Sequence, residues 1–143
     1  MSTDEELRRV LIGACRDLVH LGLTHGTSGN ASVRHGPGFL VSPTGMAYEA
    51  LEPSDVALVG LDGRWYGRRQ PSSEWRFHRD ILAARTDVGA IVHAHPRFAT
   101  ALALGEVRVL DAAQMRVVLE KFRTYGRQDI ADPDLRHAGE VPP

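Results

Sequence analysis

The chain has 143 residues, enough for one domain with a core of its own. Hydrophobic residues make up 43% of it and charged residues 24%, a balance typical of a globular protein rather than a disordered or fibrous one. Lys and Arg total 17 against 18 Asp and Glu, and this net charge of −1 argues against nucleic acid or an anionic membrane as a partner.

Three further features predict the cellular setting. No apolar run approaches the about 20 residues that a bilayer span needs. The first residues are acidic, where a signal peptide would be basic. A single cysteine, Cys15, excludes an intrachain disulfide and suits a reducing compartment. We therefore expect a cytoplasmic protein.

An amphipathic helix is predicted at the start of the chain. Apolar residues recur at three- and four-residue steps between Leu7 and Val19, and Gly22 is a plausible stop. Cys15 lies on this apolar stripe, so we interpret it as a small core residue rather than a nucleophile.

Short strands and turns are predicted next, and helices return in the second half. A glycine-rich loop at 26–30 precedes a strand, and further strands are expected at 39–41 and 56–59. A helix over 74–85, capped by Ser72 or Ser73, leads to a strand over 87–95. Further helices are predicted from Pro96 and over 111–122.

The order of these elements predicts one α/β domain over residues 1–126. Helices interspersed with strands favour a sandwich with helices on both faces of a mostly antiparallel sheet. Residues 127–143 are polar and contain three prolines, so a disordered tail is expected there.

His93-Ala94-His95 is the sharpest chemical signal. Residues two apart on a strand project from the same face, about 6.6 Å apart. Two imidazoles can tilt from there toward one cation at the about 2.0–2.1 Å of a Zn–N bond. Taken alone, the pattern is equally consistent with two histidines that bind no metal and lie on the surface or form hydrogen bonds at the end of a strand.

Glu74 follows Ser72-Ser73 at a predicted helix start. A carboxylate there is favoured by the helix dipole alone, and it also suits a metal ligand or a general acid/base. His78, one turn later, is expected to pack in the core or to support Glu74.

Three small polar loops lie at 26–30, 44–45 and 72–73. Their backbone N–H groups and hydroxyls suit phosphate, especially at a helix N-terminus, although turns need the same residue types. The first loop lacks the Gly-Lys-Ser/Thr of a Walker A motif.

Read together and in order, these segments resemble the class II aldolase/adducin family, most closely its L-fuculose-1-phosphate aldolase branch. The resemblance is carried by residues 21–34, 42–51, 71–78 and 91–96, within a nearly continuous match from about residue 5 to about residue 104. Glu at position 74, rather than the Asp of the related pentulose-phosphate 4-epimerases, favours the aldolases.

The resemblance implies a three-layer αβα sandwich, a zinc cofactor, a phosphorylated sugar as substrate and a homo-oligomer, which is a tetramer in the family. His93 and His95 match two of the three zinc histidines, and Glu74 matches the residue that ligates the resting metal and moves the substrate proton. The positions that match the family's phosphate site are Gly29, Asn30, Thr44, Gly45, Ser72 and Ser73. The implied reaction is zinc-dependent cleavage of a ketose 1-phosphate, such as L-fuculose 1-phosphate, to dihydroxyacetone phosphate and an aldehyde.

The family pattern breaks after about residue 104. The segment with the third zinc histidine is missing, and residues 111–126 look like the family's C-terminal helix, so we interpret the chain as truncated by an internal deletion. Two histidines with Glu74 still make a His₂Glu set, and His137 in the tail is a poor replacement ligand. Two alternatives stay open: a non-catalytic, adducin-like interaction module, and an inactive remnant that binds metal or phosphate.

Overall fold

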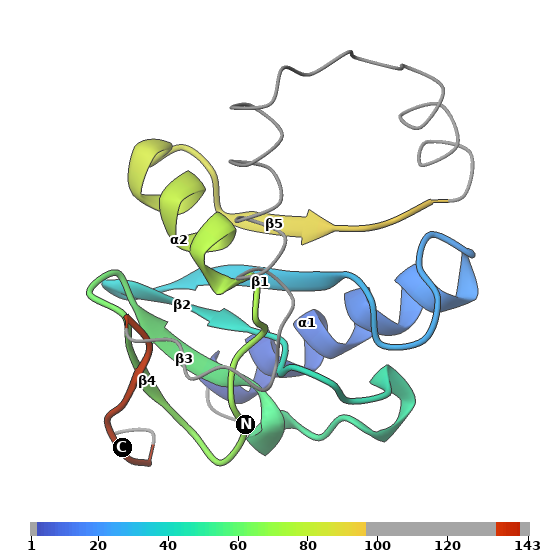
Figure 1. The fold of residues 1–143 in the computed structure, drawn as a ribbon, viewed down its shortest axis with the longest axis horizontal. Helices are drawn as coiled ribbons and strands as arrows, with labels where there is room; N and C mark the ends of the chain where they lie inside the picture. Colours follow the sequence, from blue (N-terminus) through green and yellow to red (C-terminus); the bar gives the residue numbers. More distant parts are fainter. Residues whose placement is uncertain (1–2, 97–133, 141–143) are drawn as a thin grey trace, which may run out of the picture.

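The computed structural model of the protein describes residues 3–96 and 134–140. Its strands form one sheet in the order β5-β1-β2-β3-β4-β6, in which all neighbours are antiparallel except β4 and β6 (Figure 1). The elements in chain order are α1 (Thr3–His20), β1 (Asn30–His35), β2 (Gly38–Val41), the 3-10 turns η1 (Tyr48–Ala50) and η2 (Pro53–Asp55), β3 (Ala57–Gly60), β4 (Arg64–Tyr66), α2 (Trp75–Ala84), β5 (Ala90–His93) and β6 (Arg136–His137). Within these described residues no helix is long and apolar enough to cross a membrane.

Two apolar clusters lie on opposite faces of the sheet. Side chains alternate along β2, so Leu40 packs with Leu11 and Cys15 of α1. Phe39, on the other face, packs with Trp75 of α2. The prediction of an α/β fold with helices on both faces of a mostly antiparallel sheet is therefore confirmed, and α1 and α2 form its outer layers (Figure 1).

Gly22 ends α1 as the sequence predicts. Its φ of +66° is readily adopted only by glycine, and its N–H donates to the carbonyl of Val19 at 3.0 Å. The N–H of Leu23 donates to the carbonyl of Leu18 at 2.9 Å, which completes a Schellman motif. This turn directs the chain into the loop at 26–30.

Polar residues on alternate positions of β1 fasten α2 to the sheet. Ser32 contacts His78 in the middle of α2, and Asn30 contacts both His78 and Glu74 at its N-terminal end. At the other end, the Arg34 guanidinium donates to the carbonyl of Leu82 at 2.8 Å. The side of β1 that faces α2 is thus held by hydrogen bonds rather than by apolar packing alone.

The predicted disorder of the tail does not hold for residues 134–140. The N–H of Arg136 donates to Gly63 at 2.9 Å, and the N–H of Ala138 donates to Trp65 at 2.7 Å, so this stretch adds β6 to the open edge of β4. The His137 ring stacks on Trp65 with centroids 4.2 Å apart. A polar composition carries no signal for this kind of edge pairing, because backbone groups provide the bonds.

The remaining predictions for the second half fall partly outside the described residues. The strand predicted over 87–95 is observed as β5, and the helix predicted over 74–85 is observed as α2. The helices predicted from Pro96 and over 111–122, and residues 127–133 of the tail, lie outside the residues that the structure describes.

Candidate active site

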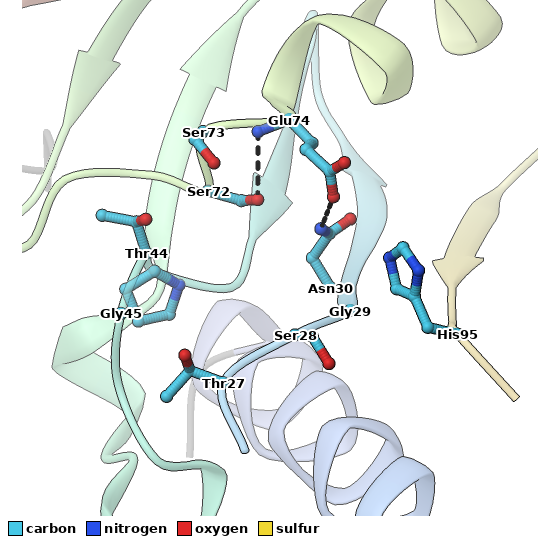
Figure 2. A pocket seen from close by; sticks show the side chains of 11 residues that line it. Thr27, Ser28, Gly29, Asn30, Thr44, Gly45, Ser72, Ser73, Glu74 and His95 are labelled. Atoms are coloured by element: carbon cyan, nitrogen blue, oxygen red, sulfur yellow. Dashed lines mark hydrogen bonds between the residues drawn. The ribbon is translucent and has the colours of Figure 1, made fainter. Parts of the chain in front are cut away.

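The three polar loops that the sequence singles out meet around one pocket of about 270 Å³ (Figure 2). Of the predicted site residues, eight line it: Gly29, Asn30, Thr44, Gly45, Ser72, Ser73, Glu74 and His95. Thr27, Ser28 and Pro43 complete the wall. The loops come from the α1–β1, β2–η1 and β4–α2 connections, so positions that are far apart in sequence face one cavity.

Glu74, His93 and His95 form a cluster of metal-ligand type at one side of this pocket. Each offers one ligand atom, and these atoms lie within 4.8 Å of one another. Oε2 of Glu74 is 2.8 Å from Nδ1 of His93, and the two imidazole centroids are 4.7 Å apart. Two imidazoles and a carboxylate are a donor set that suits Zn²⁺, and the three side chains lie near enough to converge on one ion.

Gly29 lets the first loop approach β5 closely. Its φ is +82°, and a Cβ at this position would lie 2.9 Å from the carbonyl oxygen of His93 and 3.0 Å from Oγ1 of Thr24. His95 is held from the same side, because its N–H donates to the carbonyl of Leu23 at 3.1 Å. The connection between α1 and β1 therefore lies directly against the backbone of both histidines.

Glu74 sits at the N-cap of α2 without capping the helix. Its side chain makes no capping hydrogen bond, whereas its own N–H donates to Oγ of Ser72 at 3.2 Å. Of the two serines predicted as caps, Ser72 thus contacts the helix start. The Glu74 carboxylate is left to face Asn30 (Figure 2). Its Oε2 atom also contacts the His93 ring.

A chain of buried polar groups leads from Glu74 into the layer between α2 and the sheet. Nδ2 of Asn30 donates to Oε2 of Glu74 at 2.6 Å, and Oδ1 of Asn30 lies 2.5 Å from Nε2 of His78. Nδ1 of His78 lies 2.7 Å from Oγ of Ser32. His78 is fully buried, and this burial lowers its pKa to about 4, with the neighbouring His93 contributing. His78 both packs and supports the site, but sequence reasoning missed its contacts with Asn30 and Ser32.

Two carbonyl groups of the first loop are anchored by hydroxyl groups of residues that do not line the pocket. The Tyr48 hydroxyl donates to the Gly29 carbonyl at 2.5 Å, and Oγ1 of Thr24 donates to the Ser28 carbonyl at 2.5 Å. In a trans peptide the N–H points opposite to the preceding C=O, so the N–H of Gly29 is turned away from Thr24. Ser28 belongs to the polar loop that the sequence singled out, but the contact of Thr24 with it was not predicted, although their four-residue spacing is a usable signal.

Other groups considered in the sequence lie away from the pocket. His137 is on β6, at the opposite edge of the sheet from β5, so it is not a replacement metal ligand. His35 pairs with Asp4 at 3.2 Å. Cys15 is buried in the core, and this burial raises the pKa of its thiol to about 11. Its interpretation as a core residue is confirmed.

This arrangement of sheet, helices and polar loops is that of a class II aldolase fold. The Class II Aldolase and Adducin N-terminal domain family matches residues 9–140, and the chain belongs to this family. The chain is 54% identical over 97 residues to a 5-methylthioribulose-1-phosphate/5-deoxyribulose-1-phosphate aldolase of Rhodospirillum rubrum, covering 68% of this chain and 44% of that protein. It is 40% identical over 99 residues to an L-fuculose phosphate aldolase of Escherichia coli K12, covering 69% of this chain and 46% of that protein.

Solved structures of the same family have the same fold. An L-fuculose 1-phosphate aldolase superposes with a TM-score of 0.66 at 35% identity, covering 72% of this chain and 49% of that one. The L-fuculose-1-phosphate aldolase of Thermus thermophilus gives a TM-score of 0.61 at 36% identity, covering 73% of this chain and 52% of that one. The chain spans about half the length of the curated relatives it matches.

Proposed function

We propose that the protein is a zinc-dependent aldehyde-lyase that cleaves a ketose 1-phosphate to dihydroxyacetone phosphate and an aldehyde. The observation that carries this proposal is the meeting of Glu74, His93 and His95 beside a pocket walled by three polar loops. A cytoplasmic location and a homo-oligomeric state belong to the same proposal, because the sequence features and the family resemblance favour them.

In this proposal His93, His95 and Glu74 hold the zinc ion. Zinc supplies Lewis acidity, which stabilises the negative charge that develops on the substrate's carbonyl and neighbouring hydroxyl. The reaction breaks the C3–C4 bond of the ketose: the hydroxyl on C4 loses its proton as C4 becomes the aldehyde carbon, and C3 gains a proton. Glu74 moves this proton, because its carboxylate is not used as a helix cap and faces the pocket.

The polar loops take the substrate phosphate in this proposal. Gly29, Asn30, Thr44, Gly45, Ser72 and Ser73 line the pocket together. The described residues that line it offer backbone N–H groups, hydroxyls and the positive end of the α2 dipole for this recognition. A dianionic phosphate at this end of the pocket would direct the carbonyl of the sugar toward Glu74 and His95.

Two substrates are favoured. L-fuculose 1-phosphate is the substrate that the family resemblance implies. The 54% identity to an aldolase named for 5-methylthioribulose 1-phosphate and 5-deoxyribulose 1-phosphate favours a ribulose 1-phosphate with a small or apolar group at C5 as the second candidate. Both have the same phosphorylated three-carbon end, so the same pocket walls serve either one.

The test is release of dihydroxyacetone phosphate from each substrate by the purified chain with added zinc, followed by coupled NADH oxidation. Glu74→Gln, which keeps the size of the side chain and removes its charge, is the matched variant. Release that needs both zinc and Glu74 supports the proposal. A folded sample without release contradicts it and leaves the adducin-like interaction module or the inactive remnant.

A further inference from the structure

We propose that His78, held by Ser32, is the positioning residue that orients Asn30 and through it the Glu74 carboxylate. This inference rests on the proposed function of Glu74 and extends it to residues that do not line the pocket. The chain Ser32–His78–Asn30–Glu74 connects the buried side of α2 to the metal-ligand cluster through three short contacts.

The direction of each hydrogen bond follows from the chemistry of its ends. An ionised carboxylate only accepts, so Asn30 must present its NH₂ group to Glu74, which leaves Oδ1 toward His78. Oδ1 also only accepts, so Nε2 of His78 carries the proton. Nδ1 of the neutral ring is then an acceptor for the Ser32 hydroxyl, 2.7 Å away. One tautomer of one histidine therefore selects one orientation of the Asn30 amide.

Burial of these side chains makes the other orientation of the Asn30 amide unfavourable. Ser32 and Asn30 are each 3% exposed and His78 is 0% exposed, so water has little access to the contacts of His78, and of these three residues only Asn30 lines the pocket. A rotated Asn30 amide would bring its oxygen against the carboxylate and its NH₂ against the N–H of His78. Both contacts would be repulsive in a site with little solvent, where an unmade hydrogen bond is costly.

Asn30 contacts the metal-ligand cluster through one atom, Oε2 of Glu74. Oε2 of Glu74 accepts from Asn30 at 2.6 Å and lies 2.8 Å from Nδ1 of His93. The Asn30 contact thus holds the carboxylate oxygen that is nearest to a predicted zinc ligand. Groups that orient metal ligands in this way typically change metal affinity by about 10- to 100-fold when they are removed.

Three variants separate positioning from packing. His78→Leu keeps an apolar side chain of similar size and removes both ring nitrogens. His78→Gln keeps an N–H donor close to the place of Nε2 and is the rescue variant. His20→Gln is the control, because His20 is an exposed histidine of α1 that pairs with Glu49. Nitrogen NMR of the metal-free wild-type protein reports the tautomer of His78 and needs no variant.

The first readout is solvent exchange of the Asn30 side-chain amide protons in metal-free protein. In the NMR measurement we expect the proton of His78 on Nε2. In the exchange measurement we expect slow exchange in the wild type and in His20→Gln, and exchange at least about tenfold faster in His78→Leu. The rate in His78→Gln should return to within about threefold of the wild-type rate. A His78 proton on Nδ1, or equal exchange in the wild type and His78→Leu, would overturn the inference.

The second readout is zinc affinity, measured by competition with a chromophoric chelator. We expect an affinity about 10- to 100-fold weaker in His78→Leu than in the wild type, and most of it restored in His78→Gln. A wild type that binds zinc with the same affinity as His78→Leu would overturn the inference. A wild type that binds no zinc contradicts the proposed function instead, and the tautomer and the Asn30 exchange then decide the inference alone.

Discussion

Oε2 of Glu74 lies 2.8 Å from Nδ1 of His93, and this contact joins the N-terminal end of α2 to the end of β5. The two residues are not neighbours in sequence or on one element. The sheet brings them together because β5 pairs with β1 in a register that sets His93 opposite Asn30, which in turn contacts Glu74.

Removing the histidines should abolish zinc binding. We expect His93→Ala/His95→Ala to retain no zinc after dialysis, because Glu74 alone is left of the three ligands. Metal content by mass spectrometry of the dialysed protein is the measurement. His20→Gln, which changes a histidine far from the cluster, should retain zinc like the wild type. Equal zinc content in the double variant and the wild type would place the metal elsewhere.

Replacing Gly29 by Ala should destabilise the protein. Its φ is +82° and the new Cβ would meet the His93 carbonyl oxygen at 2.9 Å, so we expect a loss of about 2 kcal/mol in the free energy of unfolding in urea. Gly13→Ala is the control, since this glycine lies within α1 and a Cβ there meets nothing within 4 Å. It should gain about 0.5–1 kcal/mol. A Gly29→Ala protein as stable as the wild type would refute the close approach.

Stability should decrease as the pH is lowered because of His78. Its pKa is about 4 in the folded protein, lowered mainly by burial from the ordinary value of 6.5. Below pH 6.5 His78 is protonated in the unfolded chain but stays neutral in the folded protein. The contribution of His78 to the free energy of unfolding is therefore complete above pH 6.5 and is lost as the pH falls toward 4.

The loss assigned to His78 is about 2–3 kcal/mol between pH 7 and pH 4.5. The measurement is urea unfolding of metal-free protein at several pH values, with His78→Gln as the comparison. The difference in unfolding free energy between the two proteins should shrink by this amount as the pH falls. A difference that does not change with pH would show that the pKa of His78 is the same in the folded and unfolded protein.

Gly63 should be required for the position of residues 134–140. Its φ is +82°, and a Cβ there would run into the Asp134 carbonyl oxygen. We expect Gly63→Ala to speed hydrogen exchange at the amides of Arg136 and Ala138, which donate to Gly63 and Trp65. Gly36→Ala tests the backbone strain alone, because Gly36 has a φ of +52° with open space around it. Unchanged protection of both amides in Gly63→Ala would contradict the observed β6 pairing.

Local spacing in the sequence predicted that His93 and His95 share one side of a strand and that Glu74 lies at a helix start. The expectation that the three belong to one site came from the family resemblance, and their side chains lie together in the structure. The sandwich with helices on both faces also follows from alternation and helical periodicity along single elements.

The parts that depend on distant pairing were not predicted. The contacts of His78 with Ser32 and Asn30 need the position of α2 on the sheet, although Asn30, Ser32 and Arg34 already mark one polar side of a strand. The pairing of residues 134–140 with the edge of β4 was not predicted, because backbone hydrogen bonds form it and side-chain composition does not indicate them.

The most direct test of the central claim is exchange of the hydroxymethyl hydrogen of dihydroxyacetone phosphate with D₂O, followed by proton NMR. This half-reaction needs only the phosphate pocket, the metal-ligand cluster and the base, and no aldehyde. We expect loss of one proton signal with zinc-loaded wild type, and an exchange rate at least about 100-fold lower in Glu74→Gln. Zinc-loaded wild type that exchanges no faster than Glu74→Gln would contradict the assignment of Glu74 as the acid/base of an aldolase.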